Sequence, residues 1–442
     1  MKKKHLKLAV IGGGSSYTPE LVEGLIRYHD EFPVAELYLA DIEAGAAKLG
    51  IIGELAQRMI DASGKPIRLH TTLDRREAIR GADFVATQIR VGMLDARSRD
   101  EKIPLAHHLI GQETTGAGGF AKALRTIPVI LDICRDIEEL APDAFMINFT
   151  NPAGIITEAV SKHSRVKSVG LCNLPISTKM QIAELYGVPQ AEMFIEIVGI
   201  NHLNWTTRVM MQGEDVTEDF LHKLAGAKGP SMANIPDLEW DSEFIQSVGA
   251  LPCPYHRYYY MKEEMYREIS EHYRETGKTR ADEVKEVEAE LFEIYKQPEV
   301  HSKPAQLEKR GGAYYSEAAV QLMKSIYNDT GDIQTVNVRN QGIIPDLPAD
   351  VSIEINCVIK SDGPHALAPT KPLPPQIRGL LQVVKAYEEL TIEAAVRGDY
   401  ASALQALTIH PLVGDEHLAK EVLADILEQN ADYLPQFRVR VR

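Results

Sequence analysis

Residues 8–20 read LAVIGGGSSYTPE, and the order of residue types in this stretch decides the fold of the first half of the chain. The apolar run LAVI is typical of a short buried strand, and three glycines follow it directly. Gly12 and Gly14 let the backbone turn tightly and come close to a pyrophosphate. Thr18 can cap a helix whose first turn holds Pro19, and the free N–H groups of such a helix start attract phosphate oxygens. The stretch therefore predicts a strand, a phosphate-binding turn and a helix.

A second strand is expected at AELYLA (35–40), which ends at Asp41. An acidic residue in this place accepts hydrogen bonds from an adenosine ribose and favours NAD over the 2′-phosphorylated cofactor. The pattern departs from GxGxxG, because Tyr17 stands where the third glycine would be. The context of strand, turn, helix, strand and acid is complete, so we expect a dinucleotide site. Its predicted cofactor-binding residues are Gly12, Gly13, Gly14, Ser15, Ser16 and Asp41.

Strand-like and helix-like segments alternate as far as residue 171. Further strands are expected at 67–71, 83–89, 144–149 and 168–171, and further helices at 42–62 and 124–140. Such alternation predicts a parallel sheet with right-handed crossovers. Paired strands at 194–200 and 205–211, a charged helical region at 256–296, extended segments at 336–339 and 351–359 and a helical end from 376 follow. The expected fold is α/β, with a Rossmann-type NAD-binding domain at 1–172 and a mixed α/β domain at 173–442.

Composition argues against a nucleic-acid-binding protein and against a membrane-spanning one. The 442 residues carry a formal net charge of −15, which argues against nucleic-acid binding because phosphate neutralisation needs a basic surface. The four cysteines form no CxxC pair, and no stretch approaches the ~20 apolar residues that a membrane span needs. The basic start MKKKHLK leads into a short apolar run and then glycines, which indicates a first strand and not a signal peptide. We expect a cytoplasmic protein with no nucleic-acid or membrane partner.

Cys172 in GLCNLP and His202 in GINHLNW each follow an apolar run. If the two runs are neighbouring strands, both side chains lie outside the carboxyl ends of a sheet, where ligands collect in α/β proteins. A thiolate and an imidazole together suit a borderline divalent metal. Taken alone, a buried cysteine is more often a small apolar residue and a lone histidine a structural one, so the spacing by itself does not predict a metal.

Other polar residues gather in loops. Glu113 lies in GQETTGAGG (111–119), which is either a plain connection or a ligand-binding loop. Asn148 and Asn151 follow a predicted strand in NFTNP, and Arg97 lies in MLDARSRDEKIP, which could equally be a solvated face.

Several motifs occur together in one order along the chain, namely IGGGSSYTPELVEGL, LIGQETTGAGGFAKALR, NFTNPAG, GLCNLP, GINHLNW and KRGGAYYSEAA. In this combination the chain resembles glycoside hydrolase family 4 over nearly its whole length, and within it the 6-phospho-β-glucosidases. The resemblance implies a second domain like that of lactate and malate dehydrogenases. It also implies NAD, a divalent metal, usually Mn²⁺, and a phosphorylated disaccharide as substrate. NAD-dependent glycosidases are exceptions to the two-carboxylate mechanism. The implied route is oxidation at C3, deprotonation at C2, elimination, water addition and reduction, which yields glucose 6-phosphate.

The resemblance also implies roles for individual residues. Cys172 and His202 would hold the metal, Tyr255 in PYHRYY would be the base, and Glu113 would raise its basicity. The implied substrate-binding residues are Arg97, Asn151, Asn173 and Arg280, the last as a phosphate contact. Asn173 stands where the α-glucosidase branch has an acidic aspartate, so it indicates β-linked substrates and leaves the general acid unassigned.

Alternatives remain open from the sequence alone. They are a 6-phospho-α-glucoside, α-galactoside or glucuronide substrate, a net NAD-dependent hydroxy-acid dehydrogenase, and an NAD-binding sensor without catalysis. The family resemblance also suggests a homodimer or homotetramer.

Overall fold

The computed structural model describes residues 3–224, 228–232, 234–310 and 315–440. The predicted KRGGAYYSEAA motif lies partly outside the described residues. The first six strands are β1 (Leu6–Ile11), β2 (Val34–Ala40), β3 (Arg68–Thr72), β4 (Phe84–Thr87), β5 (Phe145–Asn148) and β6 (Lys167–Gly170). They stand in the order β3-β2-β1-β4-β5-β6, and every neighbouring pair is parallel. This confirms the predicted Rossmann-type sheet, and the apolar run of β1 is buried at its centre.

The second half of the chain extends the same sheet. Its strands are β7 (Met193–Ile200), β8 (Leu203–Met211), β9 (Glu214–Asp215), β10 (Leu251–Pro252), β11 (Ile333–Arg339), β12 (Ser352–Lys360) and β13 (Gly363–Ala366). The order continues from β6 as β11-β12-β7-β8-β10, and each of these neighbours pairs antiparallel. The late strands β11 and β12 therefore lie between β6 and β7, and one sheet runs through both halves.

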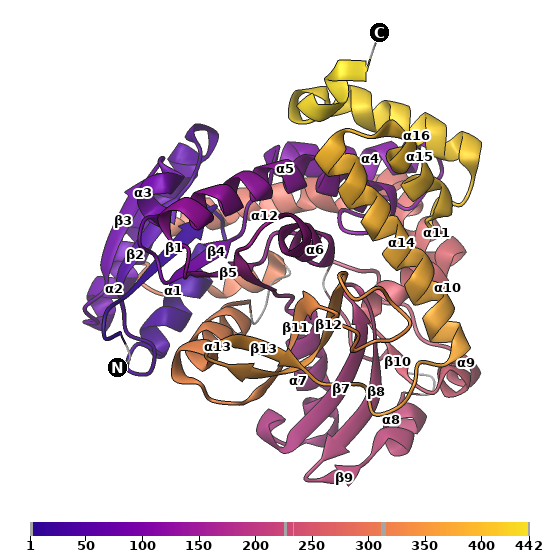
Figure 1. Ribbon diagram of the computed structural model, residues 1–442, viewed down its shortest axis with the longest axis horizontal. Helices are drawn as coiled ribbons and strands as arrows, with labels where there is room; N and C mark the ends of the chain where they lie inside the picture. Colours follow the sequence, from indigo (N-terminus) through magenta and orange to yellow (C-terminus); the bar gives the residue numbers. More distant parts are fainter. Residues whose placement is uncertain (1–2, 225–227, 233, 311–314, 441–442) are drawn as a thin grey trace.

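Helices cover the sheet. Those of the first half are α1 (Thr18–Arg27), α2 (Ala46–Ser63), α3 (Arg75–Ile79), α4 (Met93–Ala106), α5 (Gly116–Leu140) and α6 (Ala153–His163). Those of the second half are α7 (Leu174–Tyr186), α8 (Thr217–Lys223), α9 (Ser242–Val248), α10 (Arg257–Tyr260), α11 (Lys262–Thr276), α12 (Arg280–Tyr295), α13 (Tyr315–Asn328), α14 (Pro375–Arg397), α15 (Tyr400–Ile409) and α16 (Glu416–Gln429). Figure 1 shows α14 to α16, in orange and yellow, lying beside the purple α4 and α5 of the first half.

Two features matter for the site. Helix α5 begins at Gly116, so the expectation of a helix only from 124 is wrong and the GAGG run forms its first turn. Helix α12 belongs to the second half of the chain but packs against α2 and α4 of the first. None of the helices in the described ranges is long and apolar enough to cross a membrane.

Candidate active site

The glycine turn joins β1 to α1 and is tightly built. Gly12 has φ +92°, and a Cβ there would lie 2.8 Å from the backbone oxygen of Gln88, so only glycine fits. The Gly14 N–H donates to Asp41 Oδ2 at 2.8 Å, and the Ile42 N–H donates to Oδ1 at 2.8 Å. Asp41 thus already fixes the turn, and the predicted ribose contact would use the remaining lone pairs of the same carboxylate.

Helix α12 covers the other side of the turn. Ser16 Oγ donates to Glu288 Oε2 at 3.3 Å, and the Tyr295 hydroxyl donates to the Ser16 carbonyl oxygen at 2.8 Å. The Ser15 N–H donates to the Gly12 carbonyl oxygen at 3.1 Å, which is a hydrogen bond within the turn itself. The predicted cofactor-binding turn is therefore held by both halves of the chain.

Cys172 and His202 meet, although not for the predicted reason. Cys172 Sγ lies 3.6 Å from His202 Nε2. The expectation that both follow neighbouring strands is wrong, because β11 and β12 lie between β6 and β7. Three successive antiparallel pairings also make β7 run opposite to β6, so the two carboxyl ends point to opposite edges of the sheet. The side chains converge because the β7–β8 turn places His202 in a left-handed conformation, with φ +64°.

The donor set of this pair fits a divalent metal. Burial raises the pKa of the Cys172 thiol and lowers that of His202 to about 3, so the imidazole is neutral and able to ligate. His202 Nδ1 is buried without a hydrogen-bond partner in the described part of the chain. A thiolate and an imidazole suit Mn, Fe, Co, Ni or Zn. Over the same residues no group of three or more His, Cys, Asp and Glu side chains could hold a metal, so further ligands would come from elsewhere, such as sugar hydroxyls.

Tyr255 completes the cluster. It lies in a short 3₁₀ turn, Pro254–His256, and its ring stacks on the His202 ring with centroids 3.8 Å apart and planes 8° apart. Asn234 Nδ2 donates to the Tyr255 hydroxyl at 3.2 Å. Burial raises the pKa of Tyr255, and the nearby Cys172 adds to that rise. A base role for this phenol therefore requires a nearby cation that lowers its pKa.

Glu113 lies among three cations. Its carboxylate contacts Arg90, Arg97 Nη1 at 2.9 Å and Lys122 Nζ at 2.7 Å. Burial raises the pKa of Glu113, but the three cations together hold it well below the usual value. Burial and the neighbouring Arg90 lower the pKa of Lys122 to about 7, which the Glu113 charge opposes. The loop thus presents an ionised carboxylate beside excess positive charge, which suits an anionic ligand.

The Glu101 carboxylate joins Arg97, a predicted substrate-binding residue, to the start of the helix that carries Arg280, the predicted phosphate contact. Arg97 is only 5 % exposed, which rules out for this residue the alternative of a solvated helix face. Arg97 Nε donates to Glu101 Oε1 at 2.8 Å, and the Ala281 N–H donates to Glu101 Oε2 at 2.6 Å. Arg280 precedes Ala281 at the start of α12, and its Nη1 lies 2.9 Å from Glu283 Oε2. The structure therefore brings Arg97 and Arg280 into one region of the molecule.

The predicted asparagines lie at the ends of two adjacent parallel strands. Asn151 follows β5 and precedes α6, and Asn173 follows β6 as the N-cap residue of α7. Asn173 Oδ1 lies 4.0 Å from Cys172 Sγ. Asn148, in contrast, is fully buried and accepts from Thr87 Oγ1 at 3.0 Å, which is a structural contact.

Sequence reasoning missed Arg90, Lys122 and Asn234. Lys122 stands in the quoted motif GGFAKALR, nine positions after Glu113. If α5 had been predicted to begin at Gly116, Lys122 would have been expected in its second turn, close to the Glu113 loop. Neither Arg90 nor Asn234 carries a comparable local signal.

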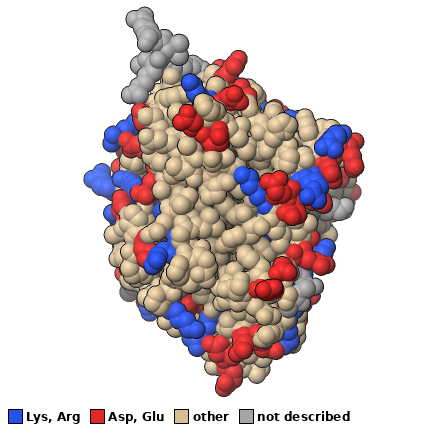
Figure 2. All heavy atoms as spheres, turned by 90° about the vertical axis from the view of Figure 1, so that its right-hand side faces the viewer, with Lys and Arg blue, Asp and Glu red and all other residues tan. Residues whose placement is uncertain are grey.

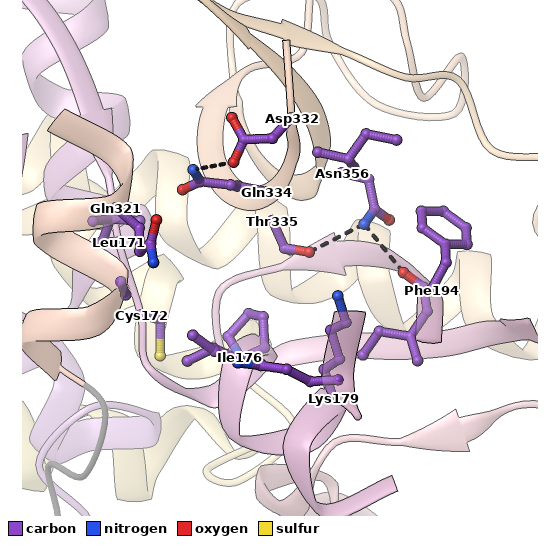
Figure 3. Close-up of a pocket in the computed structure, with 15 residues that line it drawn as sticks. Leu171, Cys172, Ile176, Lys179, Phe194, Gln321, Asp332, Gln334, Thr335 and Asn356 are labelled. Atoms are coloured by element: carbon purple, nitrogen blue, oxygen red, sulfur yellow. Dashed lines mark hydrogen bonds between the residues drawn. The ribbon is translucent and has the colours of Figure 1, made fainter. Parts of the chain in front are cut away.

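A polar chamber opens beside Cys172 between α7, α13 and β11 (Figure 3). Its volume is about 220 Å³. Asn356 Nδ2 donates to Thr335 Oγ1 at 3.2 Å, and Figure 3 shows Lys179 directed toward this pair. Lys179 forms no ion pair in the described ranges, and burial lowers its pKa. Cys172 therefore lines this chamber and also contacts His202 in the cluster of Cys172, His202 and Tyr255.

The comparisons with known proteins agree with this geometry. The model of the family 4 glycosyl hydrolases matches residues 7–188, and the model of their C-terminal domain matches residues 197–413. A Bacillus subtilis protein named probable 6-phospho-beta-glucosidase is 50 % identical over 98 % of each chain. The 6-phospho-beta-glucosidase of Escherichia coli is 44 % identical over 98 % of this chain and 97 % of its own.

Solved structures resemble the fold. The 6-phospho-beta glucosidase of Thermotoga maritima, solved with manganese, NAD⁺ and glucose-6-phosphate, is 37 % identical, covers 97 % of this chain and 99 % of its own, and gives a TM-score of 0.87. Malate dehydrogenase from Plasmodium falciparum, at 14 % identity, covers 88 % of this chain and 98 % of its own with a TM-score of 0.52, which confirms the predicted dehydrogenase-like fold. The chain belongs to glycoside hydrolase family 4.

Proposed function

We propose that this enzyme hydrolyses 6-phospho-β-glucosides, such as cellobiose 6-phosphate, to glucose 6-phosphate, with NAD and a divalent cation such as Mn²⁺. The observation that carries the proposal is the cluster in which Cys172 Sγ lies 3.6 Å from His202 Nε2 and the Tyr255 ring stacks on that imidazole. A thiol, a neutral imidazole and a phenol in contact suit metal-assisted removal of a proton. The 50 % and 44 % identical relatives support the substrate class.

The bound groups would supply hydride transfer at C3 of the sugar and charge stabilisation of the enediolate at C2 and C3. Tyr255 Oη removes the C2 proton, and the phenol ring is held in place by His202. The neutral His202 and the Cys172 sulfur hold the cation, while Glu113 keeps its negative charge beside the base. The glycine turn from Gly12 to Ser16 and Asp41 bind the dinucleotide.

Substrate contacts follow from the same placement. Arg280 and Arg97 bind the phosphate, since a guanidinium matches the oxygens of a phosphate dianion. Asn151 and Asn173 donate hydrogen bonds to sugar hydroxyls. Asn173 cannot protonate a leaving group as an aspartic acid would, which supports a β-linked substrate and a proton donor other than this residue.

The chain organisation belongs to the same proposal. We assign NAD binding to residues 1–172 and metal and substrate binding to residues 173–442, in an enzyme that acts in the cytoplasm as a homodimer or homotetramer. Figure 2 shows a face whose centre carries few Lys, Arg, Asp or Glu side chains. Depletion of charged residues is typical of the core of protein interfaces, which supports self-association.

Hydrolysis in deuterated water tests the reaction route. With NAD, Mn²⁺ and a reductant, a 6-phospho-β-glucoside should yield glucose 6-phosphate that carries deuterium at C2, because the C2 proton exchanges with solvent after its removal. Nuclear magnetic resonance of the product measures the label. Product without deuterium would contradict the elimination route, and NADH that accumulates with substrate would favour a net dehydrogenase.

Arg280→Ala should raise KM for the phosphorylated substrate by about 10- to 100-fold, the effect of losing a charged hydrogen bond of ~1.5–3 kcal/mol. Initial-rate kinetics measure it, with the unphosphorylated glucoside as the matched substrate. Arg274→Ala removes an exposed arginine at the end of α11 and serves as the control. Equal effects of Arg280→Ala on both substrates would count against a phosphate contact. Arg280 is the cleaner target, because Arg97 is buried between Glu101 and Glu113 and its loss would also disturb packing.

A further inference from the structure

Five residues that stand opposite one another on β6, β11, β12, β7 and β8 form a row across the sheet, and three of them are polar. The strand register places Asn337 of β11 opposite both Gly170 of β6 and Glu354 of β12. Glu354 in turn stands opposite Gly199 of β7, which pairs with Asn204 of β8. One row therefore joins the strand that leads to Cys172 to the hairpin that carries His202, and Glu354 is its middle member.

The Glu354 carboxylate is fully buried and receives three amide donors. Asn201 Nδ2 and Asn337 Nδ2 donate to Oε1 at 3.1 Å and 2.9 Å, and Asn204 Nδ2 donates to Oε2 at 2.5 Å. No lysine, arginine or histidine of the described ranges forms an ion pair with it. Burial raises the pKa of Glu354, and the three amide donors oppose that rise. A buried polar group of this kind is fixed in place by its hydrogen bonds.

Two of the three donors flank His202. Asn201 directly precedes it and Asn204 follows it by two residues, so Glu354 holds both sides of the β7–β8 turn. The φ of +64° at His202 is a conformation that side-chain-bearing residues rarely adopt, and it persists only where the surroundings impose it. Gly199 belongs to the same arrangement, because a Cβ there would lie 2.6 Å from Asn204 Cα.

We propose that Glu354 is the positioning residue of the metal site, holding the His202 turn in its ligating conformation through Asn201 and Asn204. This inference rests on the proposed function, in which Cys172 and His202 hold the cation. Groups that orient metal ligands in this way contribute about 10- to 100-fold to metal affinity.

The variant Glu354→Gln keeps the size of the side chain and replaces one carboxyl oxygen with an amide nitrogen. Its amide also turns a donor toward Asn204 or Asn201, where an acceptor is needed. We expect the dissociation constant for Mn²⁺, measured without substrate from the electron paramagnetic resonance signal of free Mn²⁺, to rise by about 10- to 100-fold. The dissociation constant for NAD should stay within about threefold, because the dinucleotide turn lies on other strands. In steady-state assays the lost activity should return with excess Mn²⁺.

Glu158→Gln is the matched control. Glu158, on α6, is equally buried and accepts from the N–H of Ser352, which belongs to the same strand as Glu354. It pairs with Lys385 of α14 and forms no hydrogen bond with Asn201 or Asn204 in the described ranges. Glu158→Gln should lower Tm while its Mn²⁺ affinity remains that of the parent protein. Unchanged Mn²⁺ affinity in Glu354→Gln, or an equal loss in Glu158→Gln, would overturn the proposal.

A second variant covers the case in which Glu354→Gln does not fold. Asn204→Ser removes one flank of the turn and leaves the carboxylate in place, and it should weaken Mn²⁺ binding by about tenfold. Parent-like Mn²⁺ affinity in Asn204→Ser would then overturn the proposal. A parent protein that binds no Mn²⁺ at all would instead refute the metal role of Cys172 and His202, so the two failures are distinguishable.

Discussion

Replacing Cys172 with serine should abolish tight Mn²⁺ binding and lower kcat/KM for a 6-phospho-β-glucoside by about 10²- to 10³-fold. The reason is that a serine hydroxyl stays protonated and is a poor ligand, so the developing enediolate loses its electrostatic stabilisation, which is worth about that factor in other enzymes. Electron paramagnetic resonance of Mn²⁺ and initial-rate kinetics measure the two effects. Dialysis of the parent protein against a chelator should give the same loss, reversed by Mn²⁺ in the presence of a reductant that keeps the thiol unoxidised.

Cys134→Ser is the control for this variant. Cys134 is a second free cysteine, with 1 % exposure, and it lies on α5 away from His202. It should retain parent-like Mn²⁺ affinity even if its stability falls. Full activity of Cys172→Ser, or of the chelated parent, would remove the metal from the mechanism.

Tyr255→Phe should lower kcat by about 10²- to 10⁴-fold, the usual contribution of a positioned general base. The phenylalanine ring can still stack on His202, so the dissociation constants for NAD and Mn²⁺ should remain within about threefold of the parent values. In deuterated water, exchange of the C2 proton of the substrate should disappear together with turnover. Stopped-flow or steady-state assays measure the first effect and mass spectrometry the second.

Tyr258→Phe provides the comparison for the base. Tyr258 is buried nearby, with its ring centroid 6.1 Å from that of Tyr255, but it does not stack on His202. Its replacement should change kcat by less than about tenfold. If Tyr258→Phe were inactive and Tyr255→Phe active, the base would be wrongly assigned.

The sequence predicted those parts of the molecule that local patterns determine. The stretch around Gly12 identified the first strand, the turn and α1, and the alternation beyond it identified the parallel sheet, because buried strands and amphipathic helices have different periodicities. Strand neighbours in the second half were not predictable, since insertion of β11 and β12 beside β6 depends on contacts between residues far apart in the chain.

The candidate site also contains residues that local motifs predicted and residues whose placement depends on distant contacts. Cys172 and His202 were found from their motifs, although their contact comes from a left-handed turn and not from adjacent strand ends. Arg97 resembled a surface residue because its neighbours in α4 are charged, whereas its burial depends on Glu101 and Glu113. The row through Glu354 carries no local signal at all, as it exists only once distant strands pair.

The insertion of β11 and β12 between β6 and β7 has a consequence for the order of events during protein synthesis. The strands that lead to Cys172 and His202 leave the ribosome early, but the two strands that separate and align them, residues 333–360, come more than a hundred residues later. Because domains fold as units when their contacts become available, a nascent chain that stops before β12 cannot assemble the pair. In the proposed mechanism, in which this pair holds the cation, metal binding therefore follows completion of the central sheet.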